Sequence, residues 1–140
     1  MKKIESGRSM IEMLGVLAII GVLSIGGLAG YRMAMIRHRT NQVLDYVGRC
    51  AVLAQTRGTG VEAYPATTCG AVMAGETAPQ GAAANYAVSA FAASPAAGDT
   101  FTITAPADLD ENIEAALVGR TSANPQIAMS NNAVVFTFLR

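Results

Sequence analysis

Apolar residues follow two different patterns along the chain. From Met13 to Tyr31, nineteen residues follow one another without a charge, and apolar side chains would occupy every face of a helix there. Beyond Tyr31, apolar residues recur every three to four positions, which predicts a helix with one buried face. These residues are Ile36, Val43, Val47, Cys50, Leu53 and Ala54. The two patterns together predict one helix from Ser9 to Arg57, ended by Gly58 and Gly60.

The first pattern is long enough to cross a bilayer, since a helix rises about 1.5 Å per residue and about twenty apolar residues span the hydrocarbon layer. Basic residues flank it equally on both sides, so the positive-inside rule gives a near tie, which the terminal amine tips towards a cytoplasmic N-terminus. An ordinary secretory signal peptide ending near Gly27-Leu28-Ala29 and an uncleaved signal anchor are both compatible with this segment.

Charges are distributed unevenly, although ten Lys and Arg residues balance ten Asp and Glu residues in the whole chain. Residues 1–39 hold six basic and two acidic residues, whereas residues 40–140 hold four basic and eight acidic ones. With 51% hydrophobic residues and no net charge, the composition is not that of a disordered chain. The overall basic excess of a nucleic-acid-binding domain is also missing, so no nucleic acid is expected as a partner.

The remainder of the chain predicts a small α/β head. Alternating apolar and polar residues predict strands at Asn85–Phe91, Thr100–Thr104 and Ala133–Leu139. The segments Ser122–Gln126 and Asn131-Asn132 are typical of turns. The fold class expected is therefore α+β, with a long N-terminal helix packed on a small antiparallel sheet.

A second, short helix is expected between the last two of these strands. Asp108 and Glu111 have the spacing of a capping box, and the helix they begin would end at Val118, before Gly119. Leu109, Ile113, Ala116 and Leu117 would share one face of it. The Ala-rich segment Gly70–Gly98 can bury little side-chain area, so we expect it to form the loop between helix and sheet and the edge of that sheet.

Cys50 and Cys69 are the two cysteines of the chain. If the head is exported, the oxidising compartment and the even count favour one disulfide. Such a bond would close a loop of about 20 residues and stabilise the fold by about 3 kcal/mol in the chain-entropy model. Two buried free thiols are the alternative.

The sequence from Gly7 to Leu14 is the most specific motif of the chain. A short basic leader ends in Gly7, Glu12 follows five residues later, and the unbroken apolar segment begins directly afterwards. This arrangement resembles the amino terminus of type IV pilins and related pseudopilins, over roughly residues 1–55. The residue that follows the leader in that family is usually Phe or another apolar residue, and here it is Arg8.

The resemblance implies a maturation pathway. A prepilin peptidase would cleave between Gly7 and Arg8 on the cytoplasmic side of the membrane, and the new amino terminus at Arg8 would be N-methylated. It also implies four parts: a leader (1–7), a membrane-spanning and assembly helix (8–31), its amphipathic continuation (32–60) and a globular α/β head (61–140). The order of elements in the head is most similar to that of the type IVb class.

Glu12 has two compatible interpretations. A carboxylate at the head of a spanning helix costs a few kcal/mol unless it is paired, so it is a functional residue by default. Cleavage would supply the Arg8 amine as a partner for assembly, within one chain or between neighbours. Alternatively, Ser9 and Glu12 form a capping box at the start of the helix.

Two clusters near the end of the apolar segment remain ambiguous. Gly26, Gly27 and Gly30 would be a hinge, or small residues at which two helices pack closely. The arginines of residues 32–39 are expected to form a solvated, lipid-headgroup or subunit-contacting face. His38 is the one histidine of the chain, and no spacing around it favours a metal site or Ser-His catalysis.

These observations favour a structural filament subunit with no enzymatic activity and no cofactor. Its partners would be other copies of itself in a helical polymer, the prepilin peptidase, the pilus assembly machinery and the membrane. It would reside in the bacterial inner membrane before assembly and in a surface pilus afterwards. A minor pilin or a type II secretion pseudopilin would need the same residues, and a secreted binding module with an ordinary signal peptide is the alternative from a different class.

Overall fold

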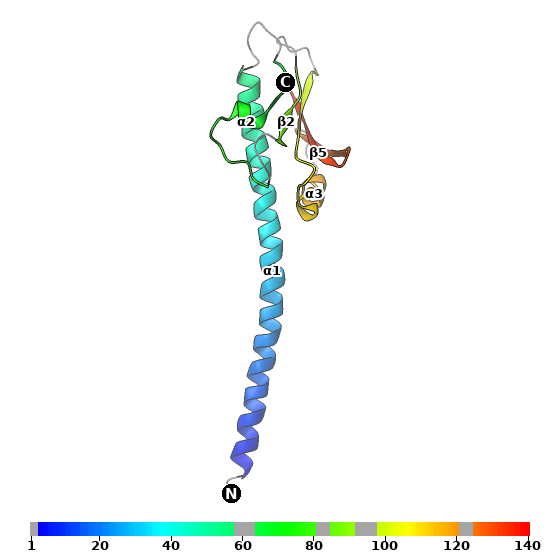
Figure 1. Cartoon of the computed structure of the whole chain (residues 1–140). Coiled ribbons are helices and arrows are strands. Elements are labelled where there is room, and N and C mark those ends of the chain that lie inside the picture. The colour runs from blue at the N-terminus through cyan, green and yellow to red at the C-terminus, as the bar shows by residue number, and fades with distance from the viewer. Residues whose placement is uncertain (1–2, 58–63, 81–84, 92–97, 121–124) are drawn as a thin grey trace. The chain divides into compact units, whose positions relative to one another are not determined.

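The computed structural model describes residues 3–57, 64–80, 85–91, 98–120 and 125–140. Helix α1 (Lys3–Arg57) is continuous over 55 residues, and the chain divides into two compact units, Met1–Met35 and Ile36–Arg140. The boundary between the units therefore falls inside α1 (Figure 1). The predicted single helix is confirmed, and it begins earlier than Ser9, inside the predicted leader.

The second unit contains one antiparallel sheet of five strands. The strands are β1 (Thr67–Thr68), β2 (Ala87–Val88), β3 (Thr100–Thr104), β4 (Gln126–Ser130) and β5 (Ala133–Leu139). Their order across the sheet is β1-β2-β3-β5-β4, and every neighbouring pair is antiparallel. Two short helices, α2 (Cys69–Val72) and α3 (Glu111–Val118), complete this unit. The expected α+β fold is confirmed.

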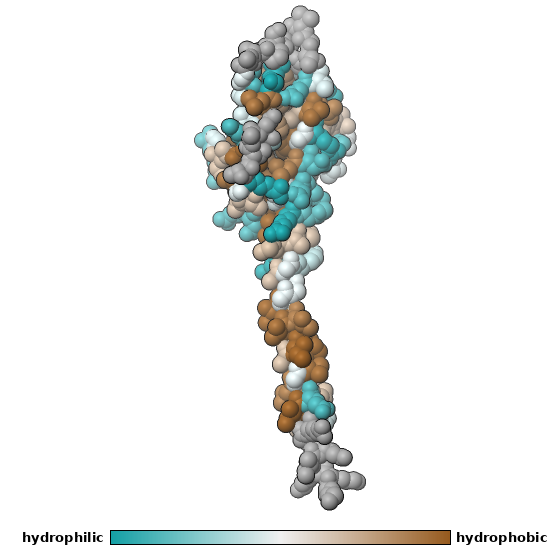
Figure 2. Space-filling view, turned by 180° about the vertical axis from the view of Figure 1, so that it is seen from behind, coloured by the Kyte–Doolittle hydropathy of each residue, from teal (hydrophilic) through white to brown (hydrophobic). Residues whose placement is uncertain are grey.

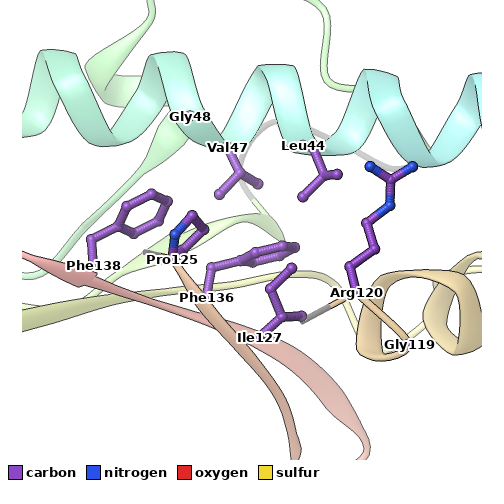
Figure 3. A pocket seen from close by; sticks show the side chains of 9 residues that line it. All are labelled: Leu44, Val47, Gly48, Gly119, Arg120, Pro125, Ile127, Phe136 and Phe138. Carbon is purple, nitrogen blue, oxygen red and sulfur yellow. The ribbon is translucent and has the colours of Figure 1, made fainter. Parts of the chain in front are cut away.

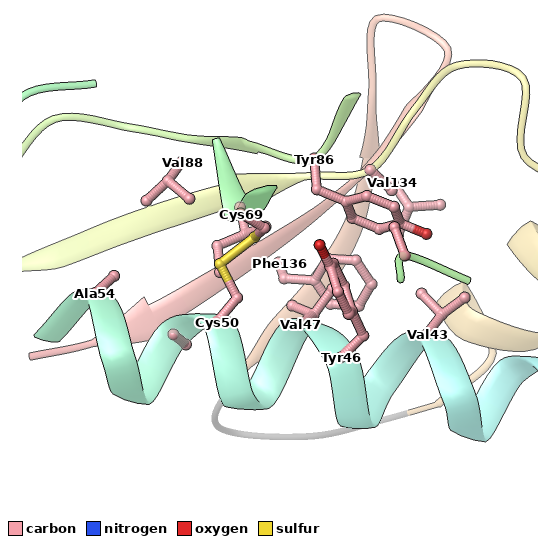
Figure 4. Close-up of a cluster of buried hydrophobic side chains, with 14 of the residues drawn as sticks. Val43, Tyr46, Val47, Cys50, Ala54, Cys69, Tyr86, Val88, Val134 and Phe136 are labelled. Atoms are coloured by element: carbon pink, nitrogen blue, oxygen red, sulfur yellow. A yellow bond between two sulfur atoms is a disulfide. The ribbon is translucent and has the colours of Figure 1, made fainter. Parts of the chain in front are cut away.

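The part of α1 that belongs to the second unit, residues 36–57, is its second part, and it packs on this sheet through the predicted apolar stripe. Val43, Val47, Cys50 and Ala54 are fully buried, whereas Ile36 is half-buried and Leu53 is exposed. The buried side chains of this stripe contact alternate residues of β3 and β5, which share one face of the sheet because successive side chains of a strand point to opposite faces. Figure 4 shows Val43, Val47 and Cys50 of α1 facing residues of the sheet, among them Val134 and Phe136 of β5. A helix on a sheet is thus the core of this unit.

The sequence prediction of the strands was correct for β3 and β5, whose bounds match Thr100–Thr104 and Ala133–Leu139. The predicted strand Asn85–Phe91 is reduced to β2, with an isolated bridge between Tyr64 and Phe91. The side chain of Ser89 explains why β2 ends at Val88. Its Oγ accepts the Thr102 N–H at 2.9 Å in place of a ladder carbonyl, so the regular pairing stops there.

The start of α3 corrects the predicted capping box. The N-cap is Asp110, whose Oδ1 accepts the Asn112 N–H at 2.9 Å, and not Asp108. The Leu109 N–H donates to Pro106 O at 3.4 Å, and this turn holds Asp108 before the helix. The end at Val118 and the burial of Leu109, Ile113 and Leu117 agree with the prediction, and Ala116 is half-buried.

The hairpin between β4 and β5 has the predicted turn at Asn131-Asn132. Both asparagines have positive φ angles, 49° and 60°, as two-residue hairpin turns require. Gln126, predicted to lie in a loop, is instead the first residue of β4, and residues 121–124 lie outside the described residues. The Ala-rich segment contains α2 and β2 where it is described, so it is not a loop throughout.

Candidate functional site

The first unit exposes its apolar side chains to an unusual extent. Fourteen large apolar residues of α1 between Met10 and Met33 are exposed, with relative accessible areas from 52% to 75%. They are Met10, Ile11, Met13, Leu14, Val16, Leu17, Ile19, Ile20, Val22, Leu23, Ile25, Leu28, Tyr31 and Met33. Figure 2 shows brown, apolar side chains along the visible face of this part of α1. Surfaces of this kind are covered by lipid or by protein in a working molecule.

This helix is long and apolar enough to cross a membrane, and it lies near the N-terminus, where a signal sequence also passes the same criterion. The polar side chain of Ser24 does not interrupt its apolar character, because the Oγ donates to Ile20 O at 2.8 Å within the helix. Such a bond removes a donor that lipid cannot satisfy. The segment Met13–Tyr31 therefore suits an environment without water.

Glu12 lies at the head of this apolar segment and is exposed. The Gly7–Arg8 bond lies inside the first turns of α1, so Arg8 precedes Glu12 by four positions in the same helix. Residues four apart are neighbours on a helix surface, and side chains tilt towards the N-terminus. The nitrogen that cleavage would free thus lies about one turn from Glu12.

Ser9 does not cap α1 in the uncleaved chain. Because α1 begins at Lys3, Ser9 lies within the helix and not at its start. Its side chain has no free helix end to cap in the full-length chain. Cleavage after Gly7 would make Ser9 the second residue of the mature chain, so both interpretations of Glu12 apply to that form.

The glycine cluster at Gly26, Gly27 and Gly30 does not interrupt the helix. A Cβ atom added at any of the three would meet nothing within 4 Å. The described chain therefore shows neither the hinge nor a helix packed against these glycines. Both of the predicted roles require another molecule or another state.

Cys50 and Cys69 form the predicted disulfide, so the alternative of two free thiols is wrong. The Cα atoms are 5.6 Å apart, and both residues are fully buried. The bond joins α1 to the first residue of α2, directly after β1 (Figure 4). It lies in the core between helix and sheet, where no solvent reaches either sulfur.

Polar contacts at the surface also join the second part of α1 to the rest of the second unit. Arg49 contacts Asp45 on α1 at 3.2 Å and Glu76, beyond α2, at 2.8 Å. The Gln55 amide donates to Leu139 O at 3.0 Å, and Arg57 donates to Ala71 O at 3.3 Å. These exposed contacts are individually worth little, so the buried stripe and the disulfide carry the attachment.

A pair of tyrosines in the core was missed by the sequence analysis. The rings of Tyr46 on α1 and Tyr86 meet edge to face, with centroids 5.1 Å apart, and both residues are buried. The Tyr86 hydroxyl donates to Pro79 O at 2.6 Å, whereas the Tyr46 hydroxyl has no partner within the described residues. Burial raises the pKa of both hydroxyls. Little in the sequence indicated this contact, because Tyr46 lies beside the apolar stripe of α1 and Tyr86 lies in an Ala-rich segment.

The basic cluster after the apolar segment is exposed. Arg37, His38 and Arg39 are all exposed, and the His38 Nε2 lies 3.2 Å from the Gln42 amide nitrogen. Among the described residues, no group of three His, Cys, Asp or Glu side chains is placed to hold a metal ion. The cluster has the chemistry of a cationic surface.

No protein-family model, no curated protein and no solved structure matches the chain.

Proposed function

We propose that this chain is the structural subunit of a type IV pilus-like filament. Its leader is removed between Gly7 and Arg8 by a prepilin peptidase, and the mature subunits polymerise through the apolar part of α1. The observation that carries the proposal is the exposure of fourteen large apolar side chains on one helix, with no covering segment in the described chain. The role is structural, and the subunit acts by packing and not by catalysis.

Two environments would cover these side chains in turn. In the inner membrane, lipid surrounds the helix, and in the filament the helices of other copies replace lipid. Since lipid tails are as apolar as the side chains, the exchange is driven by packing and by polar contacts, and not by the hydrophobic effect. The same surface therefore suits both a waiting subunit and an assembled one.

Glu12 would set the register of this packing. The free amine of Arg8 neutralises the carboxylate when a subunit enters the apolar filament core, whereas a wrong axial position leaves a charge without its partner. The i to i+4 spacing of Arg8 and Glu12 supports a pair within one chain, and the exposure of Glu12 supports a pair between copies.

The first experiment is intact-mass measurement and N-terminal sequencing of the protein from cells. We expect a mature chain that begins at a methylated Arg8 and is two hydrogens lighter than the reduced mass, because of the Cys50–Cys69 bond. A mature chain that begins near Gly30 would contradict the proposal and indicate an ordinary secreted protein. An intact leader would also contradict it and indicate a signal anchor.

The second experiment tests Glu12 directly. Glu12→Ala should reduce surface filaments about tenfold or more, since an unpaired amine in an apolar core costs several kcal/mol and 1.4 kcal/mol is already tenfold. Glu5→Ala is a matched control, because Glu5 leaves with the leader and its variant should assemble normally. Immunoblots of sheared filaments measure both. Normal filaments from Glu12→Ala would remove Glu12 from the mechanism.

A further inference from the structure

The sheet of the second unit has two edges of unequal length. One edge is β1, which has two residues and leads directly into α2. The other edge is β4, whose five residues pair with β5 on one side. Among the described residues, no strand pairs with the outer side of β4. This edge therefore presents backbone groups with which another strand could pair.

The hairpin turn determines which backbone groups of β4 point outward. The register places Ser130 opposite Ala133 across the two-residue turn, and this pair exchanges its hydrogen bonds within the hairpin. Bonded and non-bonded pairs alternate along an antiparallel ladder, so Ala128 also bonds to β5. The N–H and C=O groups of Ile127 and Met129 consequently point to the outer side.

The strand β4 lacks the features by which natural sheets prevent pairing at an edge. Its sequence contains no charged residue and no proline, and its register with β5 continues without a bulge. Four of its five residues are exposed, and Met129 is 44% exposed. An uncharged, regular edge of this length is expected where a second strand binds.

We propose that β4 pairs antiparallel with β4 of a second copy of this chain, so that the two sheets become one continuous sheet. The two-fold axis would pass beside Ala128, and Ile127 would lie opposite Met129 of the second copy. These are the residues whose backbone groups point outward, so each such pair exchanges both of its hydrogen bonds. The two Ala128 residues face each other in a non-hydrogen-bonded pair.

The side chains of β4 favour a second copy as the partner. Ile127 and Met129 lie opposite Phe136 and Val134 of β5, whose side chains are in the core, so they share the face of the sheet that carries α1. Figure 3 shows Ile127 beside Phe136 on this side. In the proposed register, the apolar side chains of one copy meet those of the other. Because the strand is uncharged, no like charges meet across the axis.

This pairing determines the relative direction of the two copies. Figure 4 shows Val43 of α1 and Val134 of β5 at the same end of the core, and the Gln55 amide donates to Leu139 O further along both elements. Within the second unit, β5 therefore runs in the same sense as α1, and β4 runs in the opposite sense. Two antiparallel β4 strands place the second units of the two copies in opposite directions.

One consequence rests on the proposed function, whereas the contact itself does not. Subunits of one filament, or of one membrane, share the direction of α1. Their second units therefore do not meet through β4 in the proposed register. The contact would join subunits of two filaments that run in opposite directions.

The first experiment uses the full chain in detergent micelles, where two copies can meet in either direction. Ala128→Cys adds a single free thiol, because Cys50 and Cys69 are bonded to each other. Facing residues of a non-hydrogen-bonded pair have Cα atoms about 4.5 Å apart, within the range of a disulfide. We expect mild oxidation with diamide to give a covalent dimer on a non-reducing gel.

Ser130→Cys is the matched control on the same exposed strand. In the proposed register, Ser130 faces Gln126 of the second copy. The two Ser130 residues then lie about 14 Å apart, since a strand rises about 3.4 Å per residue. This variant should give little covalent dimer under the same conditions. Equal amounts of dimer from both variants would overturn the proposal, because random collision or a parallel register would explain them.

A pair of charged variants tests the two-fold axis. Ala128→Lys and Ala128→Asp should each weaken the wild-type pairing about tenfold or more, because like charges then meet across the axis. An equal mixture of the two variants should pair again. Sedimentation velocity over a series of concentrations measures all four samples, since an interface of this small size is transient. Thermal melts followed by circular dichroism establish that each variant is folded.

Two further outcomes would contradict the proposal. A mixture of folded Ala128→Lys and Ala128→Asp that stays monomeric would remove the axis beside Ala128. Wild-type species that grow beyond a dimer would indicate open-ended association of edges and not a closed pair. Surface filaments of Ala128→Lys should be normal, because the filament packs through the apolar part of α1. A failure of this contact is thus distinguishable from a failure of the Glu12 experiment.

Discussion

The two parts of α1 share one continuous helix and differ in what covers them. Val22 in the first part is 73% exposed, whereas Val47 in the second part is 1% exposed. The first part is apolar on every face, and the second has a buried stripe with polar residues opposite. Since both parts are helical, secondary structure does not decide this difference. The distribution of apolar residues around the axis decides it.

One continuous helix can therefore have two parts with different surroundings. A narrow apolar stripe is satisfied by one sheet, so the second part of α1 finds its partner within its own unit. A surface that is apolar all round is too wide for one neighbour to cover, and the apolar side chains of the first part stay exposed within the described chain. The position at which the pattern changes separates the part of α1 with intramolecular contacts from the part for which we propose intermolecular ones.

Removal of the disulfide should have the largest effect, and only on the second unit. The double variant Cys50→Ala/Cys69→Ala should lower the free energy of unfolding of the head by about 3 kcal/mol, since the bond closes a loop of about 20 residues. Denaturant unfolding followed by near-ultraviolet circular dichroism, on full chain in nanodiscs, measures the loss. Reduced wild-type protein is the control and should match the variant. A variant as stable as the oxidised protein would show that the apolar stripe alone holds α1 to the sheet.

Two valines of α1, one buried and one exposed, test the difference between its two parts at single residues. Val47→Ala should cost about 2 kcal/mol of unfolding free energy, because it removes buried methyl groups and leaves a cavity. Val22→Ala, on the exposed part of the same helix, should leave head stability unchanged. The same unfolding experiment measures both. Equal losses would mean that the two parts of α1 unfold as one unit.

The smallest expected effect concerns Tyr86. Tyr86→Phe removes the hydrogen bond to Pro79 O and should cost about 1 kcal/mol. Tyr31→Phe, on the exposed part of α1, is the matched control and should cost nothing measurable. Both are measured at neutral pH by thermal unfolding of the head.

Tyr86 also predicts a pH dependence. Burial raises the pKa of its hydroxyl in the folded head, so the unfolded state loses the proton first as the pH rises. Stability is therefore fully present below about pH 10, the ordinary tyrosine pKa, and declines above it. The decline should be shallower in Tyr86→Phe than in wild type. An identical decline in both would assign the alkaline effect to other groups, with Tyr46 as the first to test.

The features that the sequence predicted well are those with a long, regular pattern. The helix of 55 residues, β3 and β5 all repeat their apolar positions over several turns or several alternations. The strand β1 has two residues and no alternation to detect. The strand β4 exposes most of its side chains at the sheet edge, so its pattern is weak.

Local chemistry was predictable only where one candidate existed. Two aspartates compete for the cap of α3, and the turn at Pro106, which the pattern does not specify, selects Asp110. The disulfide was predictable because two cysteines allow one pairing. The hollow that Leu44, Gly48 and Arg120 line beside α1 (Figure 3) was not, since these residues are distant in sequence and only the packing of α1 on the sheet brings them together.

The contact between α1 and β5 also sets an order of events during synthesis. The Gln55 amide and its partner, the Leu139 carbonyl, are 84 residues apart, and the buried stripe of α1 likewise waits for Val134 and Phe136. The apolar part of α1 leaves the ribosome first, while the last strand of its head is still missing. In a chain that enters a membrane as it is made, insertion of the apolar segment would precede folding of the head, because β5 has not yet been synthesised.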